Sequence, residues 1–148
     1  MRISAKTRYG LSALLCLARS ENPTKRTTVL NLSENLNISK IYLEQVFVLL
    51  KQAGLVSATK GAQGGYLLSR PPKEISVYDV FAAIEPALLE KTQSTVADSN
   101  EPNIEAAMHN IVFGPLDDAV REFLAGITLE DLVENINAIN SDGYMFYL

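Results

Sequence analysis

Two short helical segments separated by only about three residues constrain the fold of this chain more than any other feature. Apolar spacing predicts one helix over residues 29–36 and a second from Ser39 to about Ala53. Ser39 is placed to cap the second helix, and Gly54 follows it as a C-terminal stop. Two helices of these lengths with this connection have the dimensions of a helix-turn-helix, whose second helix fits the major groove of DNA.

A glycine-rich basic loop follows the second helix. Residues 55–69 contain two β-prone runs around a loop that carries Lys60 and the pattern Gly61-x-x-Gly64-Gly65. This arrangement predicts a β-hairpin, with glycines that let its tip approach a narrow minor groove or the adjacent phosphates. The loop lacks the strand-loop-helix context and the Lys-Ser/Thr pair of a nucleotide site, so we interpret the hairpin as the wing of a winged helix.

Four further segments have helical periodicity, and two of them begin with a capping box. The predicted helices cover residues 4–19, 77–85, 104–125 and 129–139. The capping boxes are Ser76-x-x-Asp79 and Thr128-x-x-Asp131. Pro115 has no N–H to donate, so we expect either a kink there or a new helix with Pro115 in its first turn. The predicted fold class is mainly α with a small β-hairpin wing: a winged helix-turn-helix followed by a long C-terminal dimerisation helix.

Two segments of the second half are predicted to be non-helical. Residues 90–103 are polar with little apolar content, as expected of a mobile loop. Ser141-Asp142-Gly143 is expected to turn the chain into an apolar end, residues 144–148, which should pack on the body or on a partner subunit. We predict a winged-helix DNA-binding domain at residues 1–86, and the loop, dimerisation helix, C-terminal helix and tail at residues 87–148.

The long predicted helix carries a stripe of apolar residues. They are Ile104, Met108, Ile111, Phe113, Leu116, Val120 and Phe123. These side chains could belong to the core of a single chain, but a long late helix in a helix-turn-helix protein more often joins two copies. We therefore expect the stripe to form a dimer interface.

Charge is divided unevenly along the chain. Residues 1–73 hold eleven Lys and Arg against three Asp and Glu, whereas residues 74–148 hold two against fourteen. The net charge of −4 therefore conceals a first half of +8 and a second half of −12. Because the basic half coincides with the helix-turn-helix, the charge pattern indicates a DNA-binding module joined to one that does not bind DNA.

The second helix of the motif supplies the candidate base contacts. Glu44 can accept a hydrogen bond from a cytosine amino group, and Gln45 can pair with adenine. The candidate phosphate and groove contacts are Ser39, Lys40 and Tyr42 near the start of that helix, Lys60, Gly61, Gln63 and Gly64 on the wing, and Lys6 and Arg8 in the first helix. A winged helix that binds only other proteins is the alternative.

Residues suited to catalysis or metal binding are sparse. The single cysteine, Cys16, excludes an intrachain disulfide and an all-cysteine metal or iron-sulfur site, and we expect it to be a small core residue rather than a redox sensor. The single histidine, His109, has no cysteine near it in the sequence. No apolar run approaches the ~20 residues of a membrane span. We therefore expect a soluble cytoplasmic protein with no catalytic site, metal or cofactor.

Five stretches between residues 2 and 80 form a joint pattern. They are Arg2-Ile3-Ser4-x-Lys6-x-Arg8-Tyr9-Gly10-Leu11, Ile38-Ser39-x-x-Tyr42-Leu43-Glu44-Gln45, Ala53-Gly54-Leu55-Val56, Lys60-Gly61-Ala62-x-Gly64-Gly65-Tyr66-x-Leu68 and Ile75-Ser76-Val77-x-Asp79-Val80. Together they resemble the Rrf2 family of bacterial winged-helix regulators. The resemblance implies a homodimer that places two winged helices on a palindromic operator through a long crossed helix, with Glu44 and Gln45 as base-reading residues. Lys60 stands where the family usually has an arginine, and Ile41 where some members carry a small polar residue.

The second half departs from the cluster-binding members of this family. Those members carry three cysteines in the region that matches residues 90–113, and this chain has none there, so we expect no iron-sulfur cluster. The cysteine-free loop, Leu129-Glu130-Asp131-Leu132 and the apolar end are similar to the cysteine-metabolism repressors of Gram-positive bacteria, which form a complex with cysteine synthase. We therefore expect a dimeric repressor of cysteine or sulfur metabolism genes, with cysteine synthase as a candidate partner. A family member that responds to another small molecule or protein is the alternative.

Overall fold

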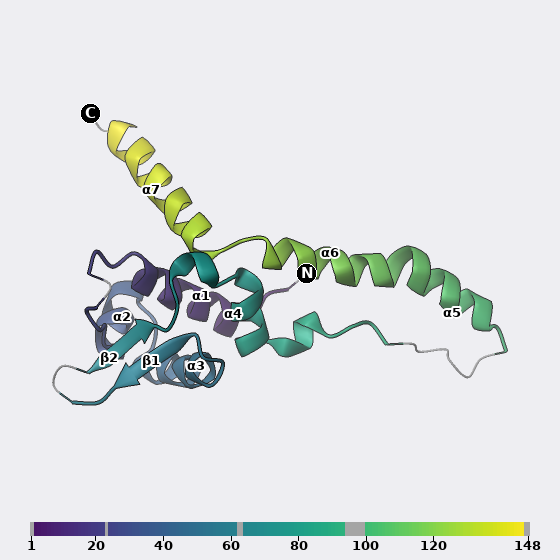
Figure 1. Cartoon of the computed structure of the whole chain (residues 1–148), viewed down its shortest axis with the longest axis horizontal. Helices are drawn as coiled ribbons and strands as arrows, with labels where there is room; N and C mark the ends of the chain where they lie inside the picture. Colours follow the sequence, from purple (N-terminus) through teal and green to yellow (C-terminus); the bar gives the residue numbers. More distant parts are fainter. Residues whose placement is uncertain (1, 23, 62–63, 94–99, 147–148) are drawn as a thin grey trace.

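The computed structural model describes residues 2–22, 24–61, 64–93 and 100–146, which form a mainly helical fold with one β-hairpin (Figure 1). The helices are α1 (Ala5–Ala18), α2 (Val29–Leu36), α3 (Lys40–Gln52), α4 (Val77–Ile84), α5 (Pro102–Met108), α6 (Gly114–Ala125) and α7 (Leu129–Phe146), and the strands are β1 (Val56–Thr59) and β2 (Gly65–Leu68). Two short 3-10 turns, η1 (Pro72–Glu74) and η2 (Pro86–Leu89), and a π-helical turn, η3 (His109–Phe113), complete the elements of the described residues. The predicted mainly helical, winged-helix fold is confirmed.

The core lies where α1, α3 and α4 pack against one another. The buried residues of α3 are Leu43, Val46, Phe47 and Leu50, which recur every three or four positions and so share one face. Gly10 of α1 is buried at the point where the three helices meet. A Cβ at this position would collide with Cδ1 of Ile84 and lie 3.1 Å from Cγ1 of Val46. The close approach of α1 to α3 and α4 therefore depends on a glycine.

A left-handed residue sets the turn between α2 and α3. Asn37 ends α2 with φ 54° and ψ 46°, a conformation that asparagine adopts more readily than most residues. The N–H of Ile38 donates to the carbonyl of Ser33 at 3.2 Å, and the Ser33 hydroxyl donates to the carbonyl of Ile38 at 2.6 Å. Ser39 then caps α3 by accepting from the N–H of Tyr42 at 3.3 Å. The predicted helix-turn-helix and its serine cap are confirmed.

The wing is attached to the segment that precedes α2. Strands β1 and β2 pair in antiparallel register, with Val56 opposite Leu68 and Thr59 opposite Gly65. Thr27 extends the pairing, because its N–H donates to the Tyr66 carbonyl at 3.0 Å and its own carbonyl accepts from the Tyr66 N–H at 2.8 Å. Gly65 has φ +134°, and a Cβ there would lie 2.6 Å from the Thr27 carbonyl oxygen. Only glycine allows this approach, so the hairpin is held to the segment before α2 as well as to itself.

The long helical arm projects from the body as α5, η3 and α6 (Figure 1). The helix begins at Pro102, so residues 102 and 103 belong to it rather than to the predicted loop. Pro115 lies in the first turn of α6, as one of the two alternatives predicted. The π-helical turn precedes it and keeps the backbone helical up to Gly114, whose N–H donates to the carbonyl of His109. The extra residue in this turn lets the helix pass a proline without breaking.

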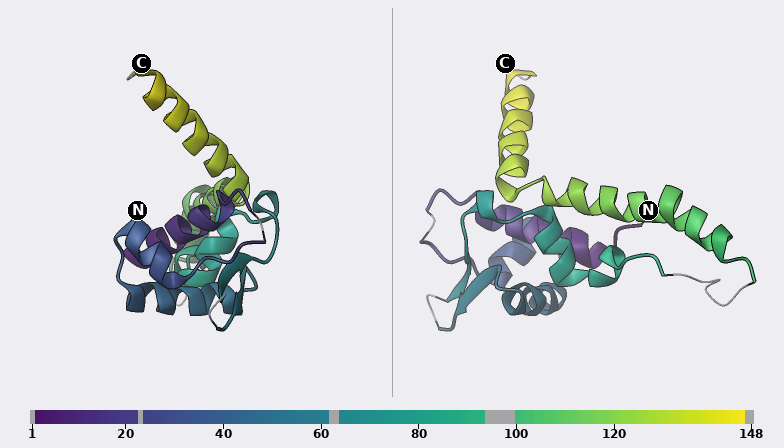
Figure 2. Two further views of the ribbon diagram at one scale, coloured as in Figure 1. Left: turned by 90° about the vertical axis from the view of Figure 1, so that its left-hand side faces the viewer. Right: turned by 45° about the vertical axis from the view of Figure 1, so that its right-hand side comes forward.

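The last helix is longer than predicted. Its capping box is confirmed, since the Asp131 N–H donates to the Thr128 hydroxyl at 3.1 Å and the Thr128 N–H donates to the Asp131 carboxylate at 2.9 Å. The turn predicted at residues 141–143 is wrong, because α7 continues to Phe146 and leaves the body at an angle to α6 (Figure 2). A glycine in an exposed helix costs only about 1 kcal/mol, and this segment contains no proline to stop the helix. The predicted packing of the 144–148 side chains lies outside the described residues.

The segment between η2 and α5 is attached to the arm where it is described. The N–H and hydroxyl of Thr92 donate to the two carboxylate oxygens of Asp117, at 2.8 and 3.0 Å. The centre of the predicted mobile loop, residues 94–99, lies outside the described residues. Among the described helices, none has both the length and the apolar content needed to cross a membrane.

A carboxylate at the end of α4 is bonded to the first turn of α1. Glu85 Oε2 accepts from the hydroxyl of Thr7 at 2.8 Å, from the hydroxyl of Ser4 at 3.0 Å and from the N–H of Ser4 at 3.4 Å. The hydrogen bond from Thr7 holds the pKa of Glu85 below its ordinary value of 4.5, and those from Ser4 act in the same direction against the opposing effect of burial. This contact joins two helices that are far apart in the sequence.

We predict that Glu85→Gln removes a pH-dependent part of the stability. Because the pKa is lowered by folding, the ionised Glu85 stabilises the fold above pH 4.5, and this contribution disappears as the pH falls through the lowered pKa. The free energy of unfolding of the unsubstituted protein should exceed that of Glu85→Gln at pH 7, and in urea titrations the difference should narrow as the pH falls below 4.5 and through the lowered pKa. Thr7→Val removes the donor that lowers the pKa of Glu85 most, so Glu85→Gln should cost less stability at pH 7 in a Thr7→Val background than in the unsubstituted protein. A gap that widens toward low pH would contradict the assignment.

Candidate nucleic-acid interface

The outer face of α3 carries the predicted base contacts. Glu44 and Gln45 are exposed, on the side opposite the buried face of the helix. Lys40 Nζ lies 3.8 Å from Glu44 Oε1, one helical turn away, and both side chains are about half exposed. Pairs of this kind on a surface contribute little to stability, so neither side chain is committed to the other. Both are free to form hydrogen bonds with a ligand.

The first turn of α3 is held in place by a serine cap and by an aromatic contact with α1. Ser39 is exposed, and its hydroxyl oxygen accepts from the Tyr42 N–H. Tyr42 is half-buried, and its ring meets that of Tyr9 edge to face, with centroids 5.3 Å apart and an interplanar angle of 80°. Tyr9 belongs to α1 and was not among the predicted contact residues, because no local pattern indicates a contact across 33 positions. This contact fixes the direction in which α3 begins.

The tip of the wing requires glycine for its own geometry. Lys60 is exposed, Gly61 has φ +107°, and the N–H of Gly64 donates to the carbonyl of Gly61 at 2.9 Å. A Cβ on Gly64 would collide with the carbonyl oxygen of Thr59. The tight turn itself therefore requires these glycines, independently of any molecule that the wing contacts. Gln63 lies outside the described residues.

The two basic candidates in α1 differ in their exposure. Arg8 is exposed and Lys6 is half-buried. Arg8 directly precedes Tyr9, the residue that meets Tyr42 in the first turn of α3. Arg8 therefore belongs to the part of α1 that lies beside α3. Among the described residues, no hydrogen bond or ion pair joins its side chain to another candidate residue.

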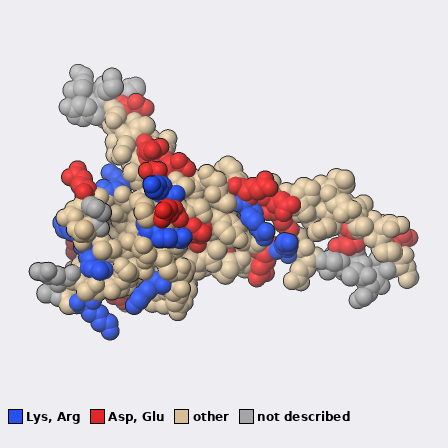
Figure 3. All heavy atoms as spheres, in the orientation of Figure 1, with Lys and Arg blue, Asp and Glu red and all other residues tan. Residues whose placement is uncertain are grey.

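Basic and acidic side chains gather on different parts of the surface. Figure 3 shows most of the visible Lys and Arg around the lobe formed by the wing and the first three helices, whereas most of the visible Asp and Glu lie along the arm and at the base of α7, with a few cations among them. Much of the α5–α6 arm carries neither charge in this view. On this face, the division of charge along the sequence is therefore largely a division in space as well.

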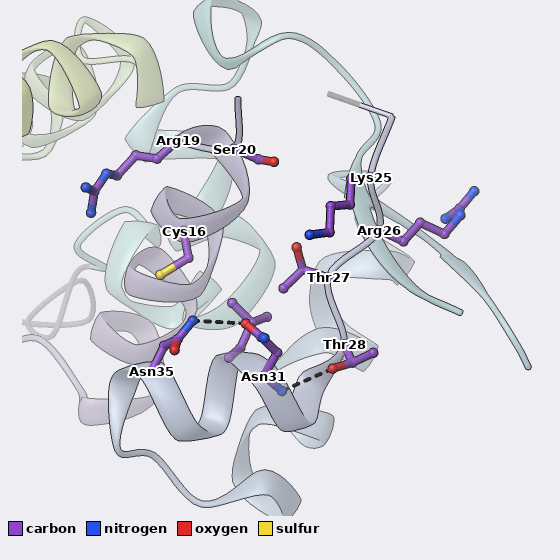
Figure 4. Close-up of a pocket in the computed structure, with 10 residues that line it drawn as sticks. Cys16, Arg19, Ser20, Lys25, Arg26, Thr27, Thr28, Asn31 and Asn35 are labelled. Atoms are coloured by element: carbon purple, nitrogen blue, oxygen red, sulfur yellow. Dashed lines mark hydrogen bonds between the residues drawn. The ribbon is translucent and has the colours of Figure 1, made fainter. Parts of the chain in front are cut away.

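A cavity of about 500 Å³ lies between the end of α1 and α2. Its lining includes Cys16, Arg19, Lys25 and Arg26. Arg19 and Arg26 point away from each other on opposite sides (Figure 4), so the cations do not converge on one point. Cys16 packs against the core as predicted, and burial raises the pKa of its thiol against the opposing effect of Arg19. Among the described residues that line this cavity, no two groups are arranged for acid–base or nucleophilic chemistry.

A helix-turn-helix with an exposed polar recognition face, followed by a basic hairpin, defines a winged-helix transcriptional regulator. The model of the Rrf2 family, described as "Iron-dependent Transcriptional regulator", matches residues 3–135. The chain therefore belongs to the Rrf2 family. Its named relatives are transcriptional regulators rather than enzymes.

Two groups of relatives are similar over nearly the whole chain. The transcriptional regulator CymR of Bacillus subtilis is 35% identical over 100% of both chains, and IscR of Pectobacterium atrosepticum is 34% identical over 95% of this chain and 84% of its own. The solved structure of CymR, "the Global Cysteine Regulator of B. subtilis", matches with a TM-score of 0.73 at 33% identity, over 91% of this chain and 98% of that one. The structure of T. potens IscR matches with a TM-score of 0.69 at 30% identity, over 92% and 88%.

The donor set of this chain does not fit the iron cofactor that the family description implies. Its one cysteine, Cys16, lies in α1, and the segment from 90 to 113 contains no cysteine. His109 is exposed on the π-helical turn. Within the described ranges, no three His, Cys, Asp or Glu side chains gather as metal ligands would. Iron-sulfur clusters need several thiolate ligands, which one chain of this protein does not supply.

Proposed function

We propose that this protein is a dimeric transcriptional repressor that binds a palindromic operator. The observation that carries the proposal is the outer face of α3, where Glu44 and Gln45 are exposed on the most basic lobe of the molecule. In this proposal Glu44 accepts from cytosine and Gln45 pairs with adenine in the major groove. The remaining contacts, to phosphates and the minor groove, come from Ser39, Lys40, Tyr42, Lys60, Gly61, Gln63, Gly64, Lys6 and Arg8.

Exposed apolar surface on the arm supports dimerisation. Ile104, Ile111, Leu116 and Phe123 are each more than half exposed, with Ile111 at 78% and Phe123 at 68%. Met108, Phe113 and Val120 are partly covered in the single chain. Phe123 and Val120 also line an apolar cavity of about 520 Å³, together with Ile3 and Phe81. Burial of these side chains in a second copy would release about 25 cal/mol for each Å² removed from water.

The two halves then have separate tasks. We propose that residues 1–86 bind DNA and that residues 87–148 dimerise and receive the signal. The signal is not read by a family-type iron-sulfur cluster, because the chain lacks the cysteines to hold one. The acidic charge of the second half keeps that surface away from phosphates.

Direct titration with DNA tests the proposal. The protein should bind operator-length duplex at 50 mM salt, and contacts to about six phosphates should make the affinity fall roughly a thousandfold by 200 mM. Fluorescence anisotropy across this salt range measures the affinity at each salt concentration. A plot of the logarithm of the affinity against the logarithm of the salt concentration then gives the salt slope. Absence of salt-sensitive binding at 50 mM would favour a module that binds only proteins.

Two variants in the same titration separate phosphate contacts from base contacts. Lys60→Ala should weaken binding to all sequences and lower the salt slope by about one for each phosphate that is no longer neutralised, whereas Lys91→Ala, in the acidic half, should change neither. Glu44→Ala should alter the preference between cognate and random duplex more than the total affinity, and Glu34→Ala on α2 is its control. Equal losses on both duplexes for Glu44→Ala would refute its base-reading role.

We predict that Phe123→Glu converts the dimer into a monomer. A carboxylate in place of a phenyl ring would have to be buried unpaired between the two arms, which is strongly unfavourable. Sedimentation velocity should show the mass of one chain, with an unchanged far-ultraviolet circular dichroism spectrum and weaker operator binding. Leu30→Glu, at an apolar residue of α2 with 53% exposure, is the matched control and should stay dimeric. A dimeric Phe123→Glu protein would place the interface elsewhere.

We further propose that the regulated genes belong to cysteine or sulfur metabolism and that cysteine synthase is a protein partner. The support is the identity to CymR along the whole chain, since the CymR structure is described as that of a global cysteine regulator. Purified cysteine synthase should co-elute with this protein in size-exclusion chromatography. If the two proteins elute separately while operator binding is intact, the alternative is a family member that answers to another small molecule or protein.

A further inference from the structure

We propose that Ile41 recognises the methyl group of a thymine in the major groove, and thereby sets part of the operator sequence. The inference rests on the proposed function, because it requires α3 to enter the groove. It adds a specificity-determining residue of apolar chemistry to a recognition face whose other predicted base contacts are polar.

Ile41 is not used by the fold. Its side chain is 70% exposed, whereas Leu43, two positions later, is fully buried. Ile41 belongs neither to the buried core cluster nor to the partly buried apolar residues packed against it. A β-branched side chain also lowers helix propensity slightly and leaves apolar surface in water. The local structure therefore gives no stabilising role to an isoleucine at this position.

The position of Ile41 on α3 places it beside the predicted base contacts. Glu44 and Gln45 follow it by three and four residues, so all three side chains share one stretch of the helix surface. In helix-turn-helix proteins the N-terminal residues of the recognition helix contact the base edges. Ile41 lies in the first turn of α3, which begins at Lys40. It is therefore placed to reach the base pair next to those that Glu44 and Gln45 reach.

The first turn of α3 is rigid enough to make such a contact selective. Ser39 caps it, Tyr42 is held edge to face against Tyr9, and Leu43 is buried. The backbone on both sides of Ile41 is therefore fixed before any DNA arrives. The isoleucine side chain has a strongly preferred χ1 in a helix, so contact with DNA costs it little conformational freedom.

Thymine is the base that offers an apolar partner. Its C5-methyl group projects into the major groove, whereas cytosine, adenine and guanine carry no methyl group there. Removal of one buried methyl group corresponds to a loss of about fourfold in affinity. This loss is smaller than the loss expected for a bidentate hydrogen bond. It acts at a defined base pair, however, and can be measured by removing a single methyl group from the DNA.

Deoxyuridine substitution tests the proposal. Binding sites are first selected from random duplexes with the unsubstituted protein. Each thymine of one half-site is then replaced in turn by deoxyuridine, which removes the methyl group and keeps every hydrogen-bonding group. At one thymine the unsubstituted protein should lose about fourfold in affinity, whereas Ile41→Ala should bind the two duplexes equally. This double substitution, in protein and DNA, isolates the contact between the two groups.

Two matched variants complete the experiment. Ile41→Val should keep most of the preference for thymine, because it retains a β-branched apolar side chain. Val48→Ala, at an apolar residue 51% exposed and seven positions further along α3, should keep the full preference. The inference is overturned if Ile41→Ala keeps the preference, if Val48→Ala abolishes it, or if no thymine is sensitive. Failure to enrich any site would instead overturn the proposed function, and the inference with it.

Discussion

Burial of one face of α3 is the constraint on which the rest of the structure depends. Phe47 lies on that face, is fully buried, and has its ring centroid 4.2 Å from that of Tyr66 on the wing. The backbone of Tyr66 is in turn paired with Thr27, just before α2. Helix α3, the hairpin and the segment before α2 are thus held by one set of contacts. Because the inner face of α3 is committed to the core, the outer face is left to meet other molecules.

Local chemistry could be predicted from the sequence, and long-range contacts could not. The serine cap of α3 and the two capping boxes were predicted because each depends on residues three positions apart. The hydrogen bonds that Glu85 accepts from Ser4 and Thr7 join residues 81 and 78 positions apart, which no periodicity reveals. The end of α7 was predicted wrongly because Ser141-Asp142-Gly143 favours a turn locally, whereas the helix around it continues. The residue types of the candidate interface and their exposure could be predicted from the helical pattern of α3. The contact of Tyr9 with Tyr42 could not.

The spatial division of charge limits how the molecule can approach a polyanion. The basic lobe contains α3 and the wing, and most of the visible acidic residues lie along the arm and at the base of α7 (Figure 3). α7 leaves the body on the side away from α3 (Figures 1 and 2). The face that carries α3 and the wing therefore presents positive charge to a duplex, and α7 points away from that face (Figure 1). Electrostatics and the helix-turn-helix geometry favour the same docking direction.

The π-helical turn at His109–Phe113 decides which way the two ends of the arm face. With about 100° of rotation per residue, an unbroken α-helix would turn Leu116, Val120 and Phe123 by roughly 120° away from Ile104, Met108 and Ile111. One extra residue in a single turn takes back about 100° of that rotation. The two apolar groups are thereby brought into line, so that a sequence out of phase with a regular helix still yields one continuous seam. The turn thus acts as a phase correction, and its position along the arm determines where the two apolar groups come to lie on one side of the helix.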